Sequence, residues 1–153
     1  HEHFGQDLSP GIAELLGRED HTFADFFRQT DIDDLTLLPG GERLENVPEV
    51  LAGSRFVSLM RKCREHYDRI IIDAPPTLGL AETSALAAMA DGTVFVVWCG
   101  YTPAPQAQTA VDQLQRSGAD LCGFVFNRVD MRSPANYCRY YYHSEYYYSS
   151  YQD

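Results

Sequence analysis

Three continuously apolar runs in the second half of the chain constrain its fold more than any other feature. They lie within the predicted strands at residues 69–73, 92–99 and 121–127, and helix-like segments at residues 82–90 and 103–117 separate these strands. Strands that are apolar at every position, rather than at alternate positions, are typical of a parallel sheet with helices on both faces. The order strand, helix, strand, helix, strand therefore predicts an α/β fold with an open, mostly parallel sheet.

The first half of the chain predicts shorter elements. Ser9 can cap a helix that ends at Gly17, and Ser54 can cap a longer helix that ends near His66. Apolar residues of the longer helix follow the i, i+3, i+4, i+7 spacing of one buried stripe: Phe56, Leu59, Met60 and Cys63. Three short elements are expected between the two helices, namely a helical piece at residues 23–28, a strand at 35–38 and a helix at 46–51.

Basic residues of the longer helix lie mostly off this stripe. They are Arg55, Arg61, Lys62 and Arg64. Such a cluster can bind phosphate, but we expect a solvated helix face or a subunit contact, because charged residues on the outer side of an amphipathic helix normally face water.

Charge and composition exclude several classes of partner. The chain has 153 residues, enough for one domain with a substantial core, and a formal net charge of −10. This negative charge argues against nucleic acid and anionic membrane surfaces as direct partners, because both are themselves negatively charged. The four cysteines are far apart and form no CxxC pair, so we expect them to be reduced. The chain starts at His1 rather than Met, and we expect it to be part of a longer polypeptide.

The ends of the predicted strands identify the candidate site, since ligands of open parallel sheets bind beyond the carboxyl ends of the strands. The first predicted strand ends in Asp73, which Ala74, Pro75 and Pro76 follow. A carboxylate on a rigid element is a hard oxygen ligand that suits Mg²⁺, and two prolines stiffen the loop behind it. The residues alone also allow a simpler role, in which Asp73 caps the turn.

The third predicted strand ends in Asn127, which Arg128 follows. An asparagine amide offers a donor and an acceptor side by side, which matches the adjacent N6 and N7 groups of adenine. Asparagine is also common where a chain turns, so the base contact and the turn both stay open as interpretations.

Several stretches together resemble one known family. YDRIIIDAPP, residues 67–76, resembles the YDxIIID(S/T/A)PP signature of the deviant-Walker P-loop ATPases. Residues 1–19, 35–68 and 90–130 resemble one branch of them, the bacterial tyrosine kinases of capsule and exopolysaccharide synthesis. The resemblance implies that Asp73 is a catalytic residue that binds Mg²⁺, directly or through water. It also implies a nucleotide site formed by Asp73, Pro75, Asn127 and Arg128.

The chain departs from that branch at several positions. It contains neither the glycine-rich GxxxxGK(S/T) loop that cradles phosphates nor the second Walker element with its aspartate. Trp98 stands where the branch often has arginine, and NVPEVL at residues 46–51 replaces the usual NPxELL. We therefore expect residues 1–130 to be the C-terminal portion of a P-loop kinase domain, inactive by itself.

The end of the chain, YCRYYYHSEYYYSSYQD at residues 137–153, holds eight of the ten tyrosines. It lacks the alternation of a strand, and it has too few cations for a surface that stacks nucleic acid. We therefore expect residues 131–153 to form a disordered, accessible tail. The expected phosphate acceptors are Tyr137, Tyr140, Tyr141, Tyr142, Tyr146, Tyr147, Tyr148 and Tyr151.

The resemblance implies an ATP-dependent protein-tyrosine autokinase that phosphorylates its own tyrosine cluster and regulates polysaccharide synthesis and export. It implies ATP and Mg²⁺ as cofactors and a homo-oligomeric ring. The other implied partners are a membrane-spanning activator and a tyrosine phosphatase, with no nucleic acid. The implied location is the cytoplasm, at the inner face of the cell membrane. Two alternatives are a non-catalytic scaffold whose tail another kinase phosphorylates, and a partition or division ATPase, which the tail disfavours.

Overall fold

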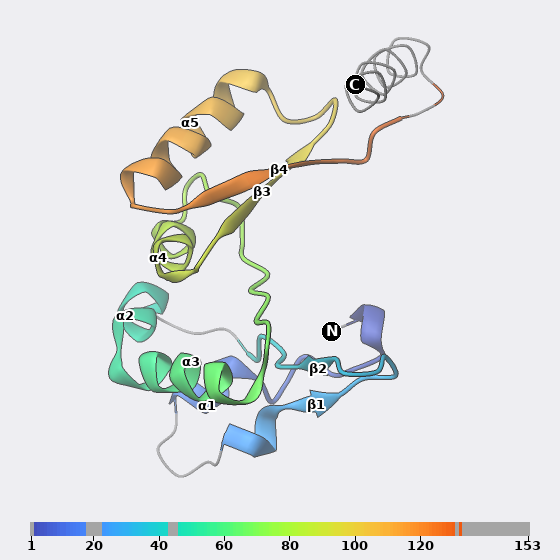
Figure 1. The fold of residues 1–153 in the computed structure, drawn as a ribbon, viewed down its shortest axis with the longest axis vertical. Coiled ribbons are helices and arrows are strands. Elements are labelled where there is room, and N and C mark those ends of the chain that lie inside the picture. Colours follow the sequence, from blue (N-terminus) through green and yellow to red (C-terminus); the bar gives the residue numbers. More distant parts are fainter. Residues whose placement is uncertain (1, 18–22, 43–45, 131, 133–153) are drawn as a thin grey trace, which may run out of the picture. The chain divides into compact units, whose positions relative to one another are not determined.

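The computed structural model describes residues 2–17, 23–42, 46–130 and 132. The chain divides into two compact units, of which unit 1 contains His1–Pro75 and Ala81–Leu86. Unit 2 contains Pro76–Leu80 and Ala87–Asp153. Figure 1 shows the helices and strands of both units. Within the described ranges, no helix is both long enough and apolar enough to cross a lipid bilayer.

Unit 1 consists mainly of short helices around one apolar core. Its elements in chain order are η1 (Glu2–Phe4), α1 (Ile12–Gly17), η2 (Phe23–Phe26), β1 (Arg28–Gln29), β2 (Thr36–Leu37), α2 (Val47–Ala52) and α3 (Ser54–His66). The strands β1 and β2 pair antiparallel, and η1 and η2 are 3₁₀ helices. The buried core residues are Leu15, Leu16, Phe26, Leu51, Phe56, Leu59 and Cys63. The core therefore joins α1 and η2 to α2 and α3.

Two predicted elements of unit 1 are shorter than expected. The helical piece predicted at residues 23–28 ends at Phe26, because Arg28 and Gln29 pair with β2 instead. The strand predicted at residues 35–38 contains only Thr36 and Leu37, both half-buried. Short antiparallel pairs of this kind depend on packing against a core rather than on the sequence pattern of the strand.

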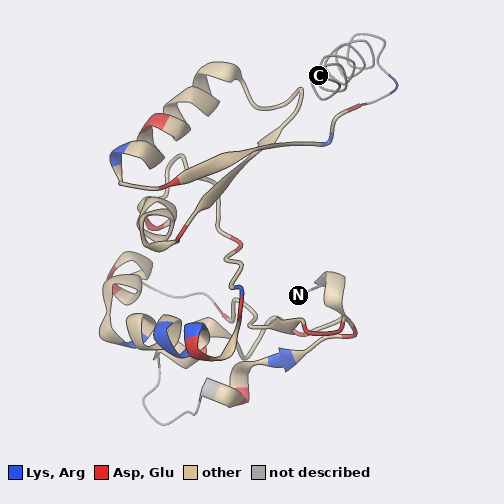
Figure 2. Cartoon of the chain, in the orientation of Figure 1, with Lys and Arg blue, Asp and Glu red and all other residues tan. Residues whose placement is uncertain are grey.

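The apolar stripe predicted for α3 is confirmed. Phe56, Leu59 and Cys63 are buried, and Figure 2 shows Lys and Arg residues gathered along this helix. Arg55 differs from the expectation of a solvated residue. Its guanidinium donates a hydrogen bond of 2.7 Å to the carbonyl of Leu15, in the last turn of α1. A carbonyl that the helix leaves without an internal partner is thereby satisfied.

The loop after β2 holds the first turn of α1. The N–H of Ile12 donates to the carbonyl of Pro39 at 2.8 Å, and the N–H of Ala13 donates to the carbonyl of Gly40 at 3.1 Å. The N–H groups at the start of a helix have no partner inside it, so another segment must supply their acceptors. Here backbone carbonyls do so, and the prediction that Ser9 caps this helix is wrong.

The Glu14 carboxylate connects the same two segments. It accepts hydrogen bonds from the N–H groups of Gly11 and Glu42, both at 2.7 Å, and from the Ser9 hydroxyl at 3.1 Å. Partial burial alone would raise the pKa of Glu14, but these hydrogen bonds outweigh it and lower the pKa from 4.5 to about 2. Gly41 lies beside this carboxylate with φ +80°, where any side chain would be strained and would collide with Glu14.

Unit 2 contains the parallel part of the sheet. The strands β3 (Thr93–Trp98) and β4 (Leu121–Asn127) pair in parallel, and α5 (Ala104–Arg116) connects them. Gly118 ends the connection with φ +86°, a conformation in which glycine is preferred. The helix α4 (Ala81–Met89) begins in unit 1 and ends in unit 2. These elements confirm the predicted α/β class and the order helix, strand, helix, strand after residue 80.

The parallel pair and the helices that precede and connect its strands agree with the predicted open parallel sheet with flanking helices. In Figure 1, α5 lies alongside the β3–β4 pair. Burial alternates along β3, with Phe95 and Val97 half-buried and Val94 and Val96 exposed. One face of β3 is therefore more buried than the other.

The strand predicted at residues 69–73 is wrong for the described structure. Residues 69–76 follow an extended path, but no described residue pairs with them, and Ile71 is 91% exposed. Isoleucine favours an extended backbone, yet a strand also needs a hydrogen-bonded neighbour. In the described sheet β3 and β4 pair only with each other, so this segment has the conformation of a strand without its ladder.

Replacing Glu14 with glutamine should lower the free energy of unfolding by about 1–3 kcal/mol at pH 7, because the charged hydrogen-bond acceptor is lost. The pKa of Glu14 is depressed in the folded state. The stabilisation that the Glu14 carboxylate contributes is therefore complete at pH values above its unfolded-state pKa near 4.5, and it is lost as the pH falls toward the folded-state pKa of about 2. Urea unfolding followed by circular dichroism at pH 7 and at pH 3 measures the loss and its pH dependence.

Glu49, an exposed glutamate in the first turn of α2, provides a matched control. Glu49→Gln should change the free energy of unfolding by less than about 0.5 kcal/mol. Equal losses of unfolding free energy in Glu14→Gln and Glu49→Gln would contradict the role of Glu14. A difference in unfolding free energy between wild type and Glu14→Gln that is as large at pH 3 as at pH 7 would contradict it too.

Candidate functional site

Asp73 and Pro75 lie on the extended segment of unit 1 that precedes α4. Asp73 is exposed, and the loop behind it is anchored, because the hydroxyl of the buried Thr83 donates a hydrogen bond of 3.1 Å to the carbonyl of Pro75. Thr83 lies in the first half of α4. The sequence pattern did not identify this anchor, since a threonine in a helix gives no sign of a partner eight residues earlier. This hydrogen bond fixes the loop that follows the exposed Asp73 carboxylate.

The Asp73 carboxylate fits the requirements of a Mg²⁺ ion held with a nucleotide. Mg²⁺ in such sites takes one or two carboxylates, and phosphate oxygens and water supply the other ligands. One exposed carboxylate on an anchored loop is therefore a suitable protein contribution. Among the described residues, no three His, Cys, Asp or Glu side chains lie close enough to hold a metal ion by themselves.

Asn127 and Arg128 lie at the carboxyl end of β4. The parallel register sets Asn127 opposite Trp98, the last residue of β3, and the N–H of Cys99 donates to the carbonyl of Asn127 at 2.9 Å. The two strands therefore end at the same edge of the sheet, which is the edge where ligands of α/β proteins bind.

The Asn127 side chain turns back onto its own backbone. Its Oδ1 accepts a hydrogen bond of 2.9 Å from the N–H of Arg128, whose φ of +55° is in the left-handed region. A side-chain acceptor that binds the next residue in this way is typical of an asparagine that shapes a turn. The turn interpretation is thus supported, and the Nδ2 group stays available as a donor toward a base.

Trp98, Tyr101 and Arg128 form a cluster at this edge. The rings of Trp98 and Tyr101 stack with centroids 4.5 Å apart and planes inclined by 29°. The guanidinium carbon of Arg128 lies 4.1 Å from the centroid of the Trp98 ring, within the range of a cation–π contact. The sequence marked Trp98 only as a departure from a family pattern. Arg128 reaches Trp98 through the register of the strands, which a single sequence does not reveal, and Tyr101 reaches it through the turn after β3.

The predicted residues thus fall into two sets. Asn127 and Arg128 are brought together with Trp98 and Tyr101 in unit 2. Asp73 and Pro75 belong to unit 1, so a shared site with Asn127 stays a prediction. The eight tail tyrosines lie outside the described residues: Tyr137, Tyr140, Tyr141, Tyr142, Tyr146, Tyr147, Tyr148 and Tyr151.

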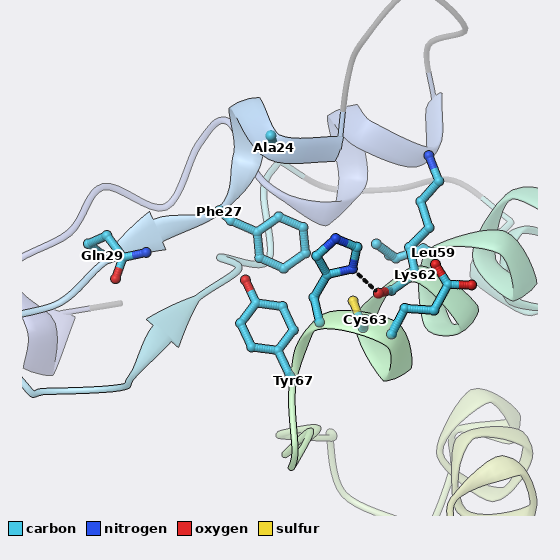
Figure 3. A pocket seen from close by; sticks show the side chains of 9 residues that line it. Ala24, Phe27, Gln29, Leu59, Lys62, Cys63 and Tyr67 are labelled. Atoms are coloured by element: carbon cyan, nitrogen blue, oxygen red, sulfur yellow. Dashed lines mark hydrogen bonds between the residues drawn. The ribbon is translucent and has the colours of Figure 1, made fainter.

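A pocket of about 550 Å³ lies elsewhere in unit 1, and Figure 3 shows it beside the end of α3. Phe27, Cys63 and Tyr67 contribute to its apolar lining, and the Phe27 and Tyr67 rings lie 5.8 Å apart. Burial raises the pKa of the Cys63 thiol, so this cysteine is a packed side chain rather than a reactive thiolate. None of the residues predicted to bind nucleotide lines this pocket.

Comparison with known sequences identifies relatives along nearly the whole chain. The chain is 32% identical over 146 residues to EpsB of Ralstonia solanacearum and 26% identical over 146 residues to wzc of Salmonella typhimurium strain LT2. Both are named tyrosine-protein kinases. Each alignment covers 95% of this chain, but only 19% of EpsB and 20% of wzc. The chain thus spans about a fifth of the length of these relatives.

Comparison with solved structures supports the fold. The VpsO kinase domain matches with a TM-score of 0.76 and 28% identity, over 84% of this chain and 64% of that chain. The chimerical protein CapA2B2 matches with a TM-score of 0.79 and 26% identity, over 84% of this chain and 57% of that chain. The predicted P-loop α/β class is therefore confirmed.

A family profile described as AAA domain matches residues 4–117, more than half of the 153 residues. The predicted resemblance is confirmed by this match together with the relatives above. The chain therefore belongs to the AAA domain family, and the members of that family that it resembles are the bacterial tyrosine kinases of capsule and exopolysaccharide synthesis.

Proposed function

We propose that this chain is the nucleotide-base and acceptor portion of an ATP-dependent protein-tyrosine autokinase that regulates polysaccharide synthesis and export. The single observation that carries the proposal is the shared edge of β3 and β4, where Asn127 and Arg128 meet Trp98. Similarity to proteins named tyrosine-protein kinases over 95% of the chain supports the same chemistry.

Asp73 and the strand ends have separate roles in the proposed reaction. Asp73 would hold Mg²⁺, directly or through water, on the loop that the hydrogen bond from Thr83 to the carbonyl of Pro75 fixes. Bound Mg²⁺ neutralises charge that develops on the transferred phosphoryl group. The Nδ2 group of Asn127, whose Oδ1 is engaged by the N–H of Arg128, would donate to the adenine edge, and Arg128, held against Trp98, would supply a cation at the same strand ends.

The acceptor in the proposed reaction is a tyrosine hydroxyl of residues 131–153. A phenol has a pKa near 10, so its proton must leave as the oxygen attacks the phosphorus atom. Most of the remaining catalysis in phosphoryl transfer comes from positioning and charge neutralisation. We propose residues 1–130 as the kinase portion and residues 131–153 as the acceptor tail.

The proposed setting of the kinase follows from its class of relatives. Polysaccharide export takes place at a membrane, so we propose a cytoplasmic kinase held at the inner face of the cell membrane by a membrane-spanning activator. A homo-oligomeric ring supplies each acceptor tail to a neighbouring subunit, and a tyrosine phosphatase resets it. The net charge of −10 argues against nucleic acid as a further partner.

In the whole protein, Asp73→Asn should lower ATP-dependent phosphotyrosine formation by about a hundredfold or more, because a neutral amide binds Mg²⁺ far less well than a carboxylate does. Quantitative mass spectrometry of tail peptides after incubation with Mg·ATP measures the effect. Asp68→Asn, at an exposed aspartate five residues earlier, is the control and should keep normal phosphorylation. Unchanged phosphotyrosine in Asp73→Asn would remove Asp73 from the mechanism and favour a scaffold that another kinase phosphorylates.

Phosphorylation of the tail should loosen the proposed ring. Each phosphate adds about −1.5 to −2 charge at pH 7, so several phosphates on each tail would repel one another and an already acidic chain. Analytical ultracentrifugation of the whole protein, before and after phosphatase treatment, should show a larger species after dephosphorylation. The same oligomer size in both states would disprove this coupling between phosphorylation and assembly.

A further inference from the structure

The two aromatic side chains at the end of β3, Trp98 and Tyr101, are exposed rather than packed into the core. Tyr101 is 72% exposed and Trp98 is 41% exposed. Large aromatic side chains contribute most to stability when they are buried, so an exposed stacked pair contributes little to the core. The pair instead presents a flat aromatic surface at the edge of the sheet where ligands bind.

The backbone holds this surface in position from two sides. Trp98 ends β3 inside the parallel ladder, and the N–H of Tyr101 donates to the carbonyl of Trp98 at 3.2 Å. On β4, the bond from the Arg128 N–H to the Asn127 side chain fixes the turn that carries the guanidinium to Trp98. Both rings and the cation are therefore preorganised by the two strand ends.

The chemistry of the surface suits a flat, π-rich ligand with a polar edge. Aromatic rings stack nucleobases, and an arginine guanidinium adds a cation that interacts with the same rings. The Nδ2 group of Asn127 supplies a donor on the neighbouring strand end, directly opposite Trp98 in the register. A hydrogen-bond donor beside a stacking face is the arrangement that recognises the edge of a base while its plane is covered.

We propose that Trp98 and Tyr101, with Arg128 held against them, form an aromatic shelf that stacks the adenine base of the nucleotide. The proposal rests on the proposed function, because it assumes that this edge of the sheet takes ATP. The new element is that the affinity for the base comes from stacking on Trp98 and Tyr101. At position 98 the family pattern often has an arginine instead of a tryptophan. Trp98 and Tyr101 are then base-binding residues, and they take no part in phosphoryl transfer.

The test uses the whole protein and measures the Kd for Mg·ADP and for inorganic tripolyphosphate by isothermal titration calorimetry. Trp98→Leu and Tyr101→Leu should each raise the Kd for Mg·ADP about tenfold, which is within the usual effect of losing one base–aromatic stack. The Kd for tripolyphosphate, which has no base, should stay within about twofold. Phe124→Leu is the control, because Phe124 is an exposed aromatic residue on β4 that lies against Phe95, away from the strand end.

A conservative variant separates stacking from a structural role of the side chain. Trp98→Phe keeps an aromatic face and should keep the Kd for Mg·ADP within about threefold of the wild type. Trp98 is also the sole tryptophan of the chain. The change in tryptophan emission that Mg·ADP causes in the wild type should therefore be smaller in Trp98→Phe, although that variant still binds the nucleotide.

Different failures point to different parts of the account. If the leucine variants bind Mg·ADP as the wild type does, or lose affinity for Mg·ADP and tripolyphosphate equally, the aromatic shelf is wrong and the kinase proposal stands. If the wild type binds no Mg·ADP at all, the proposed function itself fails, and the shelf with it.

Discussion

Parallel pairing of β3 with β4 is the interaction on which the candidate site depends. The register sets Trp98 opposite Asn127, so both strands end at one edge and their last side chains become neighbours. A slip of one residue would turn every side chain of the slipped strand to the other face and would separate Trp98 from Arg128. The cluster of Trp98, Tyr101 and Arg128 is thus a consequence of backbone hydrogen bonding, and α5 makes the parallel arrangement possible by connecting the strands.

Unit 1 depends on a different kind of constraint, in which polar groups join segments far apart in the sequence. Backbone carbonyls of Pro39 and Gly40 complete the first turn of α1, and the Glu14 carboxylate binds the same loop. Arg55 on α3 and Thr83 on α4 each donate to a backbone carbonyl of another segment. Small helices provide little apolar area to bury, so such charged and polar contacts matter more in unit 1 than in a large core.

The sequence predicted those elements that have a clear local pattern. The strand at residues 121–127 has the predicted boundaries, because an apolar run followed by Asn127 defines it. The helix α3 ends at His66 as predicted, but its N-cap residue is Gly53, and the prediction that Ser54 caps it is wrong. The strand at residues 69–73 was mispredicted, since three isoleucines specify an extended backbone but not a hydrogen-bonded partner. Contacts between distant residues, such as Glu14 with Glu42 or Trp98 with Arg128, have no local signal at all.

The central claim is that ATP binds at the shared end of β3 and β4, and photo-cross-linking of the whole protein with 8-azido-ATP tests it most directly. The account predicts that adducts, mapped by mass spectrometry, fall on the peptides that contain residues 98–101 or 127–128, and that excess Mg·ATP prevents them. Adducts confined to other peptides, such as those that line the pocket beside Phe27 and Tyr67, would contradict the account.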